Sequence, residues 1–158
     1  MEDRFFIIHN EEDVQRPVQY FAESIKDIIN ERGLIVFLNG ELGSGKTFFV
    51  KEFAYNIGIE RNVQSPTFTL MKTYDVDSEI YPNIYKMVHI DAYRLEPHHK
   101  ETLRVEDFIS EPGTIVFVEW PTAIDLDISI CFANINFKVI TETMRNIEIK
   151  FTENLSKI

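Results

Sequence analysis

Residues 40–47 form the segment of the sequence with the clearest chemistry. They read Gly-Glu-Leu-Gly-Ser-Gly-Lys-Thr and fit the pattern G-x-x-x-x-G-K-[ST], the Walker A or P-loop motif. Glycines allow backbone conformations that are closed to other residues, so consecutive N–H groups can point at phosphate oxygens. A helix that starts directly after the loop adds the partial positive charge of its N-terminus. The motif therefore predicts a binding site for a nucleoside triphosphate.

Two side chains of this loop have separate roles in phosphate chemistry. Lys46 reaches the β- and γ-phosphates, and the hydroxyl of Thr47 coordinates Mg²⁺. We expect the nucleotide to contact the following residues of the loop: Gly40, Leu42, Gly43, Ser44, Gly45, Lys46 and Thr47.

Nucleotide chemistry at such a loop also needs a carboxylate at the end of a neighbouring strand, to hold Mg²⁺ or its water. Two residues qualify, because Asp91 ends the apolar run 87–91 and Glu119 ends the apolar run 115–119. Both follow strands at their carboxyl ends, which is the edge where open α/β sheets bind ligands. Either carboxylate can be the direct ligand of the metal.

Residues 65–69, Ser-Pro-Thr-Phe-Thr, lie between the loop helix and the next predicted strand. Nucleotide switches keep the segment that senses the γ-phosphate at this place, and Thr67 or Thr69 could reach Mg²⁺. A strand entry stiffened by Pro66 would give the same spacing, so a purely structural role is the alternative interpretation.

Four further residues have simpler interpretations. His89 shares a strand face with Asp91, and a structural, hydrogen-bonded histidine is the favoured reading. Arg94 either orients a phosphate or pairs locally. Trp120 is expected to point away from the preceding carboxylate and to pack in the core. Cys131 alternates with apolar neighbours and is expected to be a small core residue.

Hydrophobic periodicity predicts the elements that position these residues. The run at 34–38 is apolar without alternation, as in a strand buried on both faces of a parallel sheet. The alternating tail predicts a hairpin at a sheet edge. The predicted strands are 5–8, 34–38, 67–74, 84–91 and 114–119, the helices 14–29, 46–57 and 97–110, and the hairpin 128–139 with 145–151.

This order of elements predicts an α/β protein with a P-loop NTPase fold. A central, mainly parallel sheet carries antiparallel edge strands and flanking helices. A chain of 158 residues fits one domain, which we assign to residues 1–158.

Charge and composition restrict the setting. The net charge is −10 and the basic residues are scattered, so contact with nucleic acid is expected to go through a partner. One cysteine cannot form an internal disulfide, which favours a reducing compartment. No apolar run approaches the roughly 18 residues of a membrane span, and the N-terminus does not resemble a signal peptide. We expect a cytoplasmic protein without a membrane partner.

Four segments together resemble the TsaE family, also called YjeE, of bacterial ATPases that act in tRNA threonylcarbamoyladenosine biosynthesis. They are residues 38–47, 65–69, 89–95 and 118–120, and the similarity extends from about Glu11 to the strand at 145–149. The resemblance implies that ATP is hydrolysed in a complex with the TsaB and TsaD proteins. That complex attaches threonylcarbamoyl to the adenosine beside the anticodon, so that tRNA is reached indirectly.

The resemblance also implies roles for individual residues. Thr47 and Glu119 coordinate Mg²⁺, and Asp91 supports the metal site. Residues 65–69 act as the switch, and Glu11 lies near the adenine or the ribose. The catalytic set expected from the motifs and the resemblance is Lys46, Asp91, Glu119, Thr67 and Thr69.

Other classes of P-loop protein fit the sequence less well. Small-molecule kinases close an arginine-bearing lid over the phosphates, and no arginine occurs between Glu119 and Arg145. A GTPase would need an Asn/Thr-Lys-x-Asp segment for guanine, which is absent. A nucleotide-dependent binding module without a coupled reaction stays open beside the kinase. Arg94 is the one arginine near the switch, so we expect hydrolysis that is weak in the isolated chain and stimulated by partners.

Overall fold

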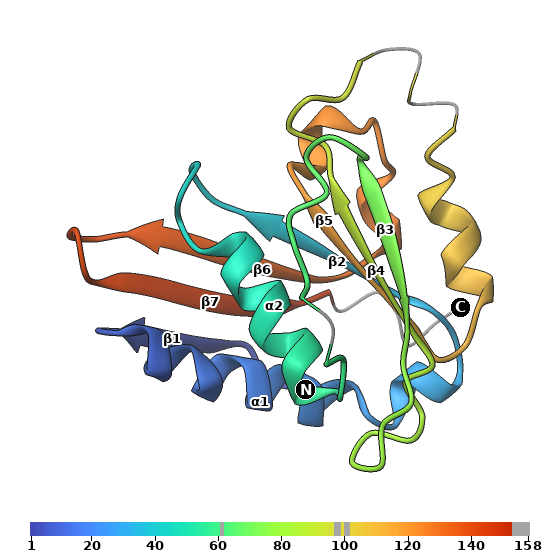
Figure 1. Ribbon diagram of the computed structural model, residues 1–158, viewed down its shortest axis with the longest axis horizontal. Helices are drawn as coiled ribbons and strands as arrows, with labels where there is room; N and C mark the ends of the chain where they lie inside the picture. Colours follow the sequence, from blue (N-terminus) through green and yellow to red (C-terminus); the bar gives the residue numbers. More distant parts are fainter. Residues whose placement is uncertain (61, 97–98, 100–101, 153–158) are drawn as a thin grey trace.

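A mixed sheet of seven strands runs through the protein, in the order β1-β7-β6-β2-β5-β4-β3 (Figure 1). The computed structural model describes residues 1–60, 62–96, 99 and 102–152. The strands are β1 (Arg4–Ile8), β2 (Leu34–Asn39), β3 (Met71–Asp75), β4 (Lys86–Asp91), β5 (Thr114–Glu119), β6 (Cys131–Val139) and β7 (Arg145–Phe151).

Four adjacent strands, β6, β2, β5 and β4, run parallel, because β2 pairs with β5 and with β6 while β5 pairs with β4. Five of the six residues of β2 and all six of β5 are buried, which confirms the prediction from their unbroken apolar runs. The carboxyl ends of these strands meet at one edge of the sheet. The register there places Glu119 between Leu38 on one side and Asp91 on the other.

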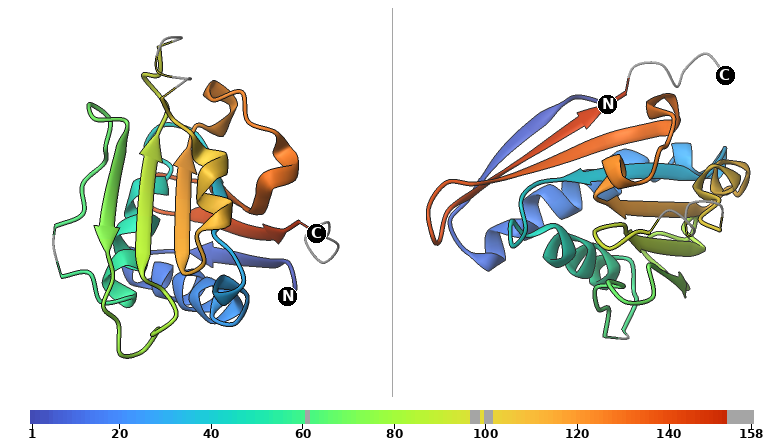
Figure 2. Two further views of the ribbon diagram at one scale, coloured as in Figure 1. Left: turned by 90° about the vertical axis from the view of Figure 1, so that its right-hand side faces the viewer. Right: turned by 90° about the horizontal axis from the view of Figure 1, so that it is seen from above.

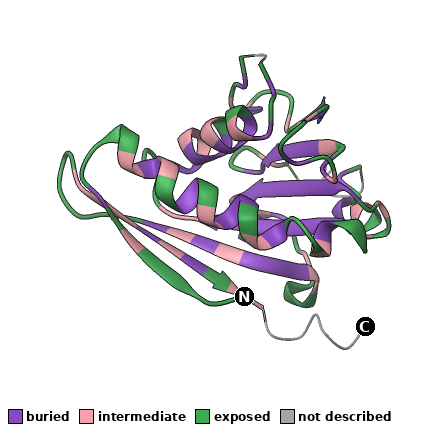
Figure 3. Ribbon diagram, turned by 90° about the horizontal axis from the view of Figure 1, so that it is seen from below, coloured by how far each residue is buried: buried purple, intermediate pink, exposed green. Residues whose placement is uncertain are grey.

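The alternating pattern of residues 128–139 and 145–151 predicted a hairpin at an edge of the sheet. This prediction is wrong, because the hairpin of β6 and β7 lies inside the sheet. β6 pairs with β2 in the interior, and β7 is covered by β1, which runs antiparallel to it. β1 and β3 are therefore the two edges, and both are antiparallel to their neighbours. The predicted fold class, with a mainly parallel centre and antiparallel edges, is confirmed. In Figure 3 the strands at the centre of the sheet are purple because they are buried, whereas most residues of β1 are exposed.

Two α-helices, α1 (Gln15–Ile25) and α2 (Lys46–Asn56), cover one face of the sheet. A short 3-10 helix, η1 (Glu11–Val14), leads into α1, and the side chain of Asn10 caps it by accepting the N–H of Asp13 at 3.1 Å. The predicted helix 14–29 is shorter than expected, because α1 ends at Ile25 and a separate 3-10 turn, η2 (Ile28–Asn30), follows.

Among the described residues, the opposite face is covered by 3-10 helices (Figure 2). They are η4 (Val105–Ser110), η5 (Pro121–Ala123) and η6 (Ile128–Ile130). Of the predicted helix 97–110, the last six residues form η4. Residues 97, 98, 100 and 101 lie outside the described part of the chain. None of the helices in the described ranges is long and apolar enough to cross a bilayer.

Aromatic side chains pack α2 against the sheet and so fix the position of its first turn. Phe53 of α2 is fully buried, and its ring centroid lies 5.0 Å from that of Phe117 in β5 and 5.9 Å from that of Phe21 in α1. The contacts join both helices to β5.

We expect Phe53→Ala to lower the free energy of unfolding by about 3–5 kcal/mol, because it leaves a cavity among these rings. The matched control is Phe68→Ala, which removes a ring that is 87% exposed and should change stability by less than about 0.5 kcal/mol. Urea unfolding followed by circular dichroism measures both values. Equal losses in the two variants would contradict this account of the core.

Candidate nucleotide-binding site

The glycine-rich loop at 40–45 connects β2 to α2 and depends on glycine at three places. Gly43 and Gly45 have φ angles of 76° and 106°, in the left-handed region that side chains disfavour. A Cβ on Gly40 would lie 2.5 Å from the Oγ of Ser44 and 2.8 Å from the carbonyl oxygen of Phe137. The loop can therefore fold tightly in front of α2, with Gly45 as the N-cap residue of that helix.

A cavity of about 440 Å³ lies between this loop and the carboxyl ends of β4 and β5. Loop residues 42–47 line it together with Thr67, Asp91 and Glu119. The structure thus brings most of the predicted site residues into one space, which we call the phosphate cavity. Gly40 does not line it and acts through the shape of the loop.

The ammonium group of Lys46 is held inside this cavity by neutral partners. Its Nζ donates to the carbonyl oxygens of Gly40 at 2.6 Å and Glu41 at 2.8 Å, and it lies 4.3 Å from the ring centroid of Trp120. Burial lowers the pKa of Lys46, and the negative charges of Glu119 and Asp91 oppose that shift. A buried cation with carbonyl and aromatic partners is well suited to meet an anion.

Glu119 connects the sheet to the first turn of α2. Its Oε1 accepts a hydrogen bond from the Thr47 hydroxyl at 2.7 Å and lies 3.1 Å from Nε2 of His89. No group of three or more His, Cys, Asp and Glu side chains suited to a metal occurs within the described ranges. Mg²⁺ does not need one, because it is bound by few protein oxygens plus water and phosphate. A hydroxyl beside a buried carboxylate fits this cation.

Asp91 is engaged by the predicted switch segment. Its Oδ2 accepts hydrogen bonds from the hydroxyls of Ser65 at 3.0 Å and Thr67 at 3.1 Å, and its Oδ1 accepts the N–H of Tyr93 at 3.0 Å. Three donors therefore occupy this carboxylate. Asp91 holds the segment against the end of β4, whereas Glu119 faces the P-loop.

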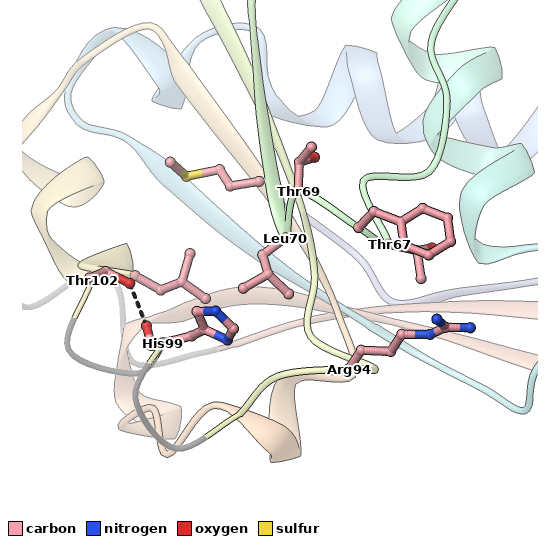
Figure 4. A pocket seen from close by; sticks show the side chains of 9 residues that line it. Thr67, Thr69, Leu70, Arg94, His99 and Thr102 are labelled. Atoms are coloured by element: carbon pink, nitrogen blue, oxygen red, sulfur yellow. Dashed lines mark hydrogen bonds between the residues drawn. The ribbon is translucent and has the colours of Figure 1, made fainter.

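Thr69 does not line the phosphate cavity, whereas Thr67 does, although we placed both in the catalytic set. A turn at 66–70, in which Leu70 has a φ of 63° and donates its N–H to the Pro66 carbonyl at 2.7 Å, reverses the chain before β3 begins. The predicted strand 67–74 accordingly starts only at Met71. Thr69 is exposed and lines a second cavity, also of about 440 Å³, which shares Thr67 and Arg94 with the phosphate cavity (Figure 4).

A third cavity, of about 520 Å³, lies on the other side of the P-loop and contains Glu11. It shares residues 43–45 and Phe48 with the phosphate cavity, so the two spaces adjoin along the loop. Phe137 and Arg145 from the β6–β7 hairpin also line it. Glu11, the first residue of η1, therefore lies in a cavity that adjoins the phosphate cavity.

Three residues of these cavities were not expected from the sequence. Trp120 was expected to point away from Glu119 into the core, but it is only partly buried, lines the phosphate cavity together with Glu119 and covers Lys46. Its φ of 58° departs from the strand, and the proline that follows it is the signal that strand alternation ends there. Tyr93, with its ring 5.0 Å from that of Trp120, and Arg145 carry no local signal.

His89, Arg94 and Cys131 are placed as follows. His89 is fully buried, and its Nε2 has the hydrogen-bond partner that we expected, Oε1 of Glu119. Arg94 lines the phosphate cavity, and its guanidinium carbon lies 5.2 Å from the ring centroid of Phe68. Cys131 is buried as predicted, and burial raises the pKa of its thiol to about 11.

Comparisons with known proteins agree with the geometry. The model of the family "Threonylcarbamoyl adenosine biosynthesis protein TsaE" matches residues 8–149. Several proteins named "tRNA threonylcarbamoyladenosine biosynthesis protein TsaE" are similar to this chain in sequence. The one from Rickettsia felis is 33% identical over 141 residues, which are 88% of this chain and 75% of that protein. The one from Rickettsia bellii is 31% identical over 141 residues, covering 88% and 89%.

A solved structure shows the same fold. The crystal structure of Bacillus subtilis YdiB matches with a TM-score of 0.70 and 25% identity, over 97% of this chain and 88% of that one. The sheet order and the loop between β2 and α2 therefore belong to a P-loop NTPase fold. From this fold and the match over residues 8–149, we conclude that the chain belongs to the TsaE family.

Proposed function

We propose that this protein binds ATP with Mg²⁺ and hydrolyses it as part of the threonylcarbamoyl modification of the tRNA adenosine beside the anticodon. Membership of the TsaE family places the chain in tRNA threonylcarbamoyladenosine biosynthesis. The observation that carries the ATPase proposal is the 2.7 Å hydrogen bond between the Thr47 hydroxyl and Glu119, directly behind the P-loop. It joins the hydroxyl and the carboxylate that Mg²⁺-dependent P-loop enzymes use.

The two adjoining cavities suit the two halves of ATP. The triphosphate fits the phosphate cavity, where the N–H groups of the P-loop, the start of α2 and Lys46 supply positive charge. The nucleoside fits the third cavity, where Glu11 and Phe48 lie, because residues 43–45 separate the two spaces. In one cavity, a carboxylate can bind the ribose hydroxyls and an aromatic ring the flat face of a base.

Thr47 and Glu119 would hold the metal, which when bound neutralises charge on the β- and γ-phosphates. Asp91 supports the site from behind by fixing residues 65–67. Lys46 leaves its two carbonyl partners for phosphate oxygens, which are stronger acceptors because they are charged.

The isolated chain is expected to hydrolyse ATP slowly. Of the arginines in the described part, Arg94 alone lines the phosphate cavity, and its guanidinium stacks near the exposed ring of Phe68. A supplied positive group is worth 10³–10⁵ in rate in enzymes of this class. We propose that the TsaB and TsaD proteins complete the site, and that tRNA is reached through them because this chain carries a net charge of −10.

Lys46→Ala should abolish ATP hydrolysis and weaken ATP binding about 10- to 100-fold, because it removes a charged contact to the phosphates. The control is Lys51→Ala, which removes an exposed lysine from the same helix and should bind ATP like the wild type. Calorimetry measures binding, phosphate release measures hydrolysis, and circular dichroism checks the fold. A folded Lys46→Ala variant with wild-type hydrolysis would contradict the P-loop assignment.

The two carboxylates should differ in their effect on Mg²⁺. We expect Glu119→Gln to raise the Mg²⁺ concentration needed for tight ATP binding by about 10- to 100-fold and Asp91→Asn to raise it less, since Asp91 is occupied by three donors. The isosteric amides keep both positions filled. A Mg²⁺ titration at fixed ATP gives the order, and the reverse order would make Asp91 the direct ligand.

Thr67 and Thr69 provide a matched pair for the proposed switch. With TsaB and TsaD present, Thr67→Ala should lower the stimulated rate of phosphate release about 10-fold, because Asp91 loses a donor that positions the segment. Thr69→Ala should have little effect, because Thr69 lies outside the phosphate cavity. If the isolated chain releases phosphate rapidly and the rate does not change when TsaB and TsaD are added, the proposed stimulation is refuted.

A further inference from the structure

His89 is a fully buried polar residue for which the proposed ATPase has no assigned role. It lies in β4 between Val88 and Ile90, and its neighbour across the sheet in β5 is Phe117. Its Nδ1 has no hydrogen-bond partner. Burying an imidazole with one nitrogen unpaired costs free energy, so an apolar residue would serve packing alone better.

The other ring nitrogen identifies what this residue does. Nε2 of His89 lies 3.1 Å from Oε1 of Glu119, and a carboxylate oxygen can only accept, so Nε2 carries the proton. The same oxygen receives the Thr47 hydroxyl at 2.7 Å. Side chains from β4, β5 and α2 therefore meet at a single atom.

A glutamate needs such a restraint more than an aspartate does. It has one more rotatable bond, so its carboxylate can reach more positions from the same backbone. One competing position is close at hand, because the ammonium of Lys46 lies in the same cavity and feels the charge of Glu119. A carboxylate that moved to Lys46 would leave Thr47 and would neutralise the charge intended for phosphate.

We propose that His89 is a positioning residue, whose Nε2–H holds the Glu119 carboxylate on the Thr47 hydroxyl and thereby sets the affinity of the nucleotide site for Mg²⁺. This inference rests on the proposed function and adds to it a residue that touches neither the nucleotide cavity nor the metal. Loss of a hydrogen-bond partner behind a metal ligand typically costs 10- to 100-fold in metal affinity or activity.

Three substitutions separate the hydrogen bond from packing. His89→Leu fills much of the space without a donor, His89→Gln places an amide N–H near the position of Nε2, and His89→Asn carries the same amide on a shorter side chain. Calorimetry with ADP as the probe, in chelator and at rising Mg²⁺, measures the nucleotide affinity and the Mg²⁺ midpoint for each variant.

We expect His89→Leu and His89→Asn to raise the Mg²⁺ midpoint about 10- to 100-fold while leaving ADP affinity in chelator unchanged. His89→Gln should return the midpoint close to the wild-type value, which a role in packing alone would not produce. If His89→Leu fails to fold, the comparison of the two amides still decides the question. An unchanged Mg²⁺ midpoint in His89→Asn would overturn the proposal. So would a loss of ADP affinity in that variant that is as large in chelator as with Mg²⁺.

A second measurement needs no nucleotide. Long-range ¹H–¹⁵N NMR of the wild-type protein should show His89 protonated at Nε2, and Glu119→Leu should shift that resonance strongly. Protonation at Nδ1 alone would overturn the role of His89. A wild-type protein that binds no ADP at any Mg²⁺ concentration would instead refute the proposed function, so the two failures are distinguishable.

Discussion

One hydrogen bond, from the Thr47 hydroxyl to the Glu119 carboxylate, joins the two halves of the site on which the remaining chemistry depends. Thr47 belongs to α2, whose start is set by the glycine loop, and Glu119 ends β5, whose place is set by parallel pairing with β2. A separation of 2.7 Å requires α2 to be held against the sheet, and the burial of Phe49 and Phe53 achieves this. Apolar packing and polar chemistry are therefore coupled, because any loosening of the helix also separates these two oxygens.

The buried charges of the site are stabilised by partners that do not cancel them. Lys46 is held by carbonyl oxygens and an indole ring, Asp91 by hydroxyls and an N–H, and Glu119 by a hydroxyl and an imidazole. Removing a charge from water costs several kcal/mol unless hydrogen bonds compensate for it. Because the carbonyl, hydroxyl and N–H partners carry no net charge, the charges of Lys46 and Asp91 remain available to a triphosphate and its cation.

The parts of the fold that follow from local sequence could be predicted, and the parts that depend on tertiary contacts could not. The apolar runs of β2 and β5 and the glycine spacing carry local signals, and parallel strands bring Asp91 and Glu119 to one edge. The turn that separates Thr69 from the phosphates ends in a left-handed leucine, for which no sequence preference exists. The covering of Lys46 by Trp120 and the placement of Arg145 depend on elements far apart in the chain, as does the insertion of the hairpin between β1 and β2.

The pairing of β1 with β7 has a consequence for how the protein acquires its structure. These strands lie at opposite ends of the described chain, and the N–H of Phe151 reaches the carboxylate of Asp3 at 2.9 Å. During synthesis on the ribosome β1 emerges before all the other strands of the sheet that the structure describes, and its partner β7 emerges after them. Contacts of such high sequence separation form slowly, because a long loop must close before they contribute. The β1 segment, with Phe5 and Ile7 exposed even in the finished fold, thus has no partner strand until β7 has been made, and an unpaired strand edge of this kind favours aggregation.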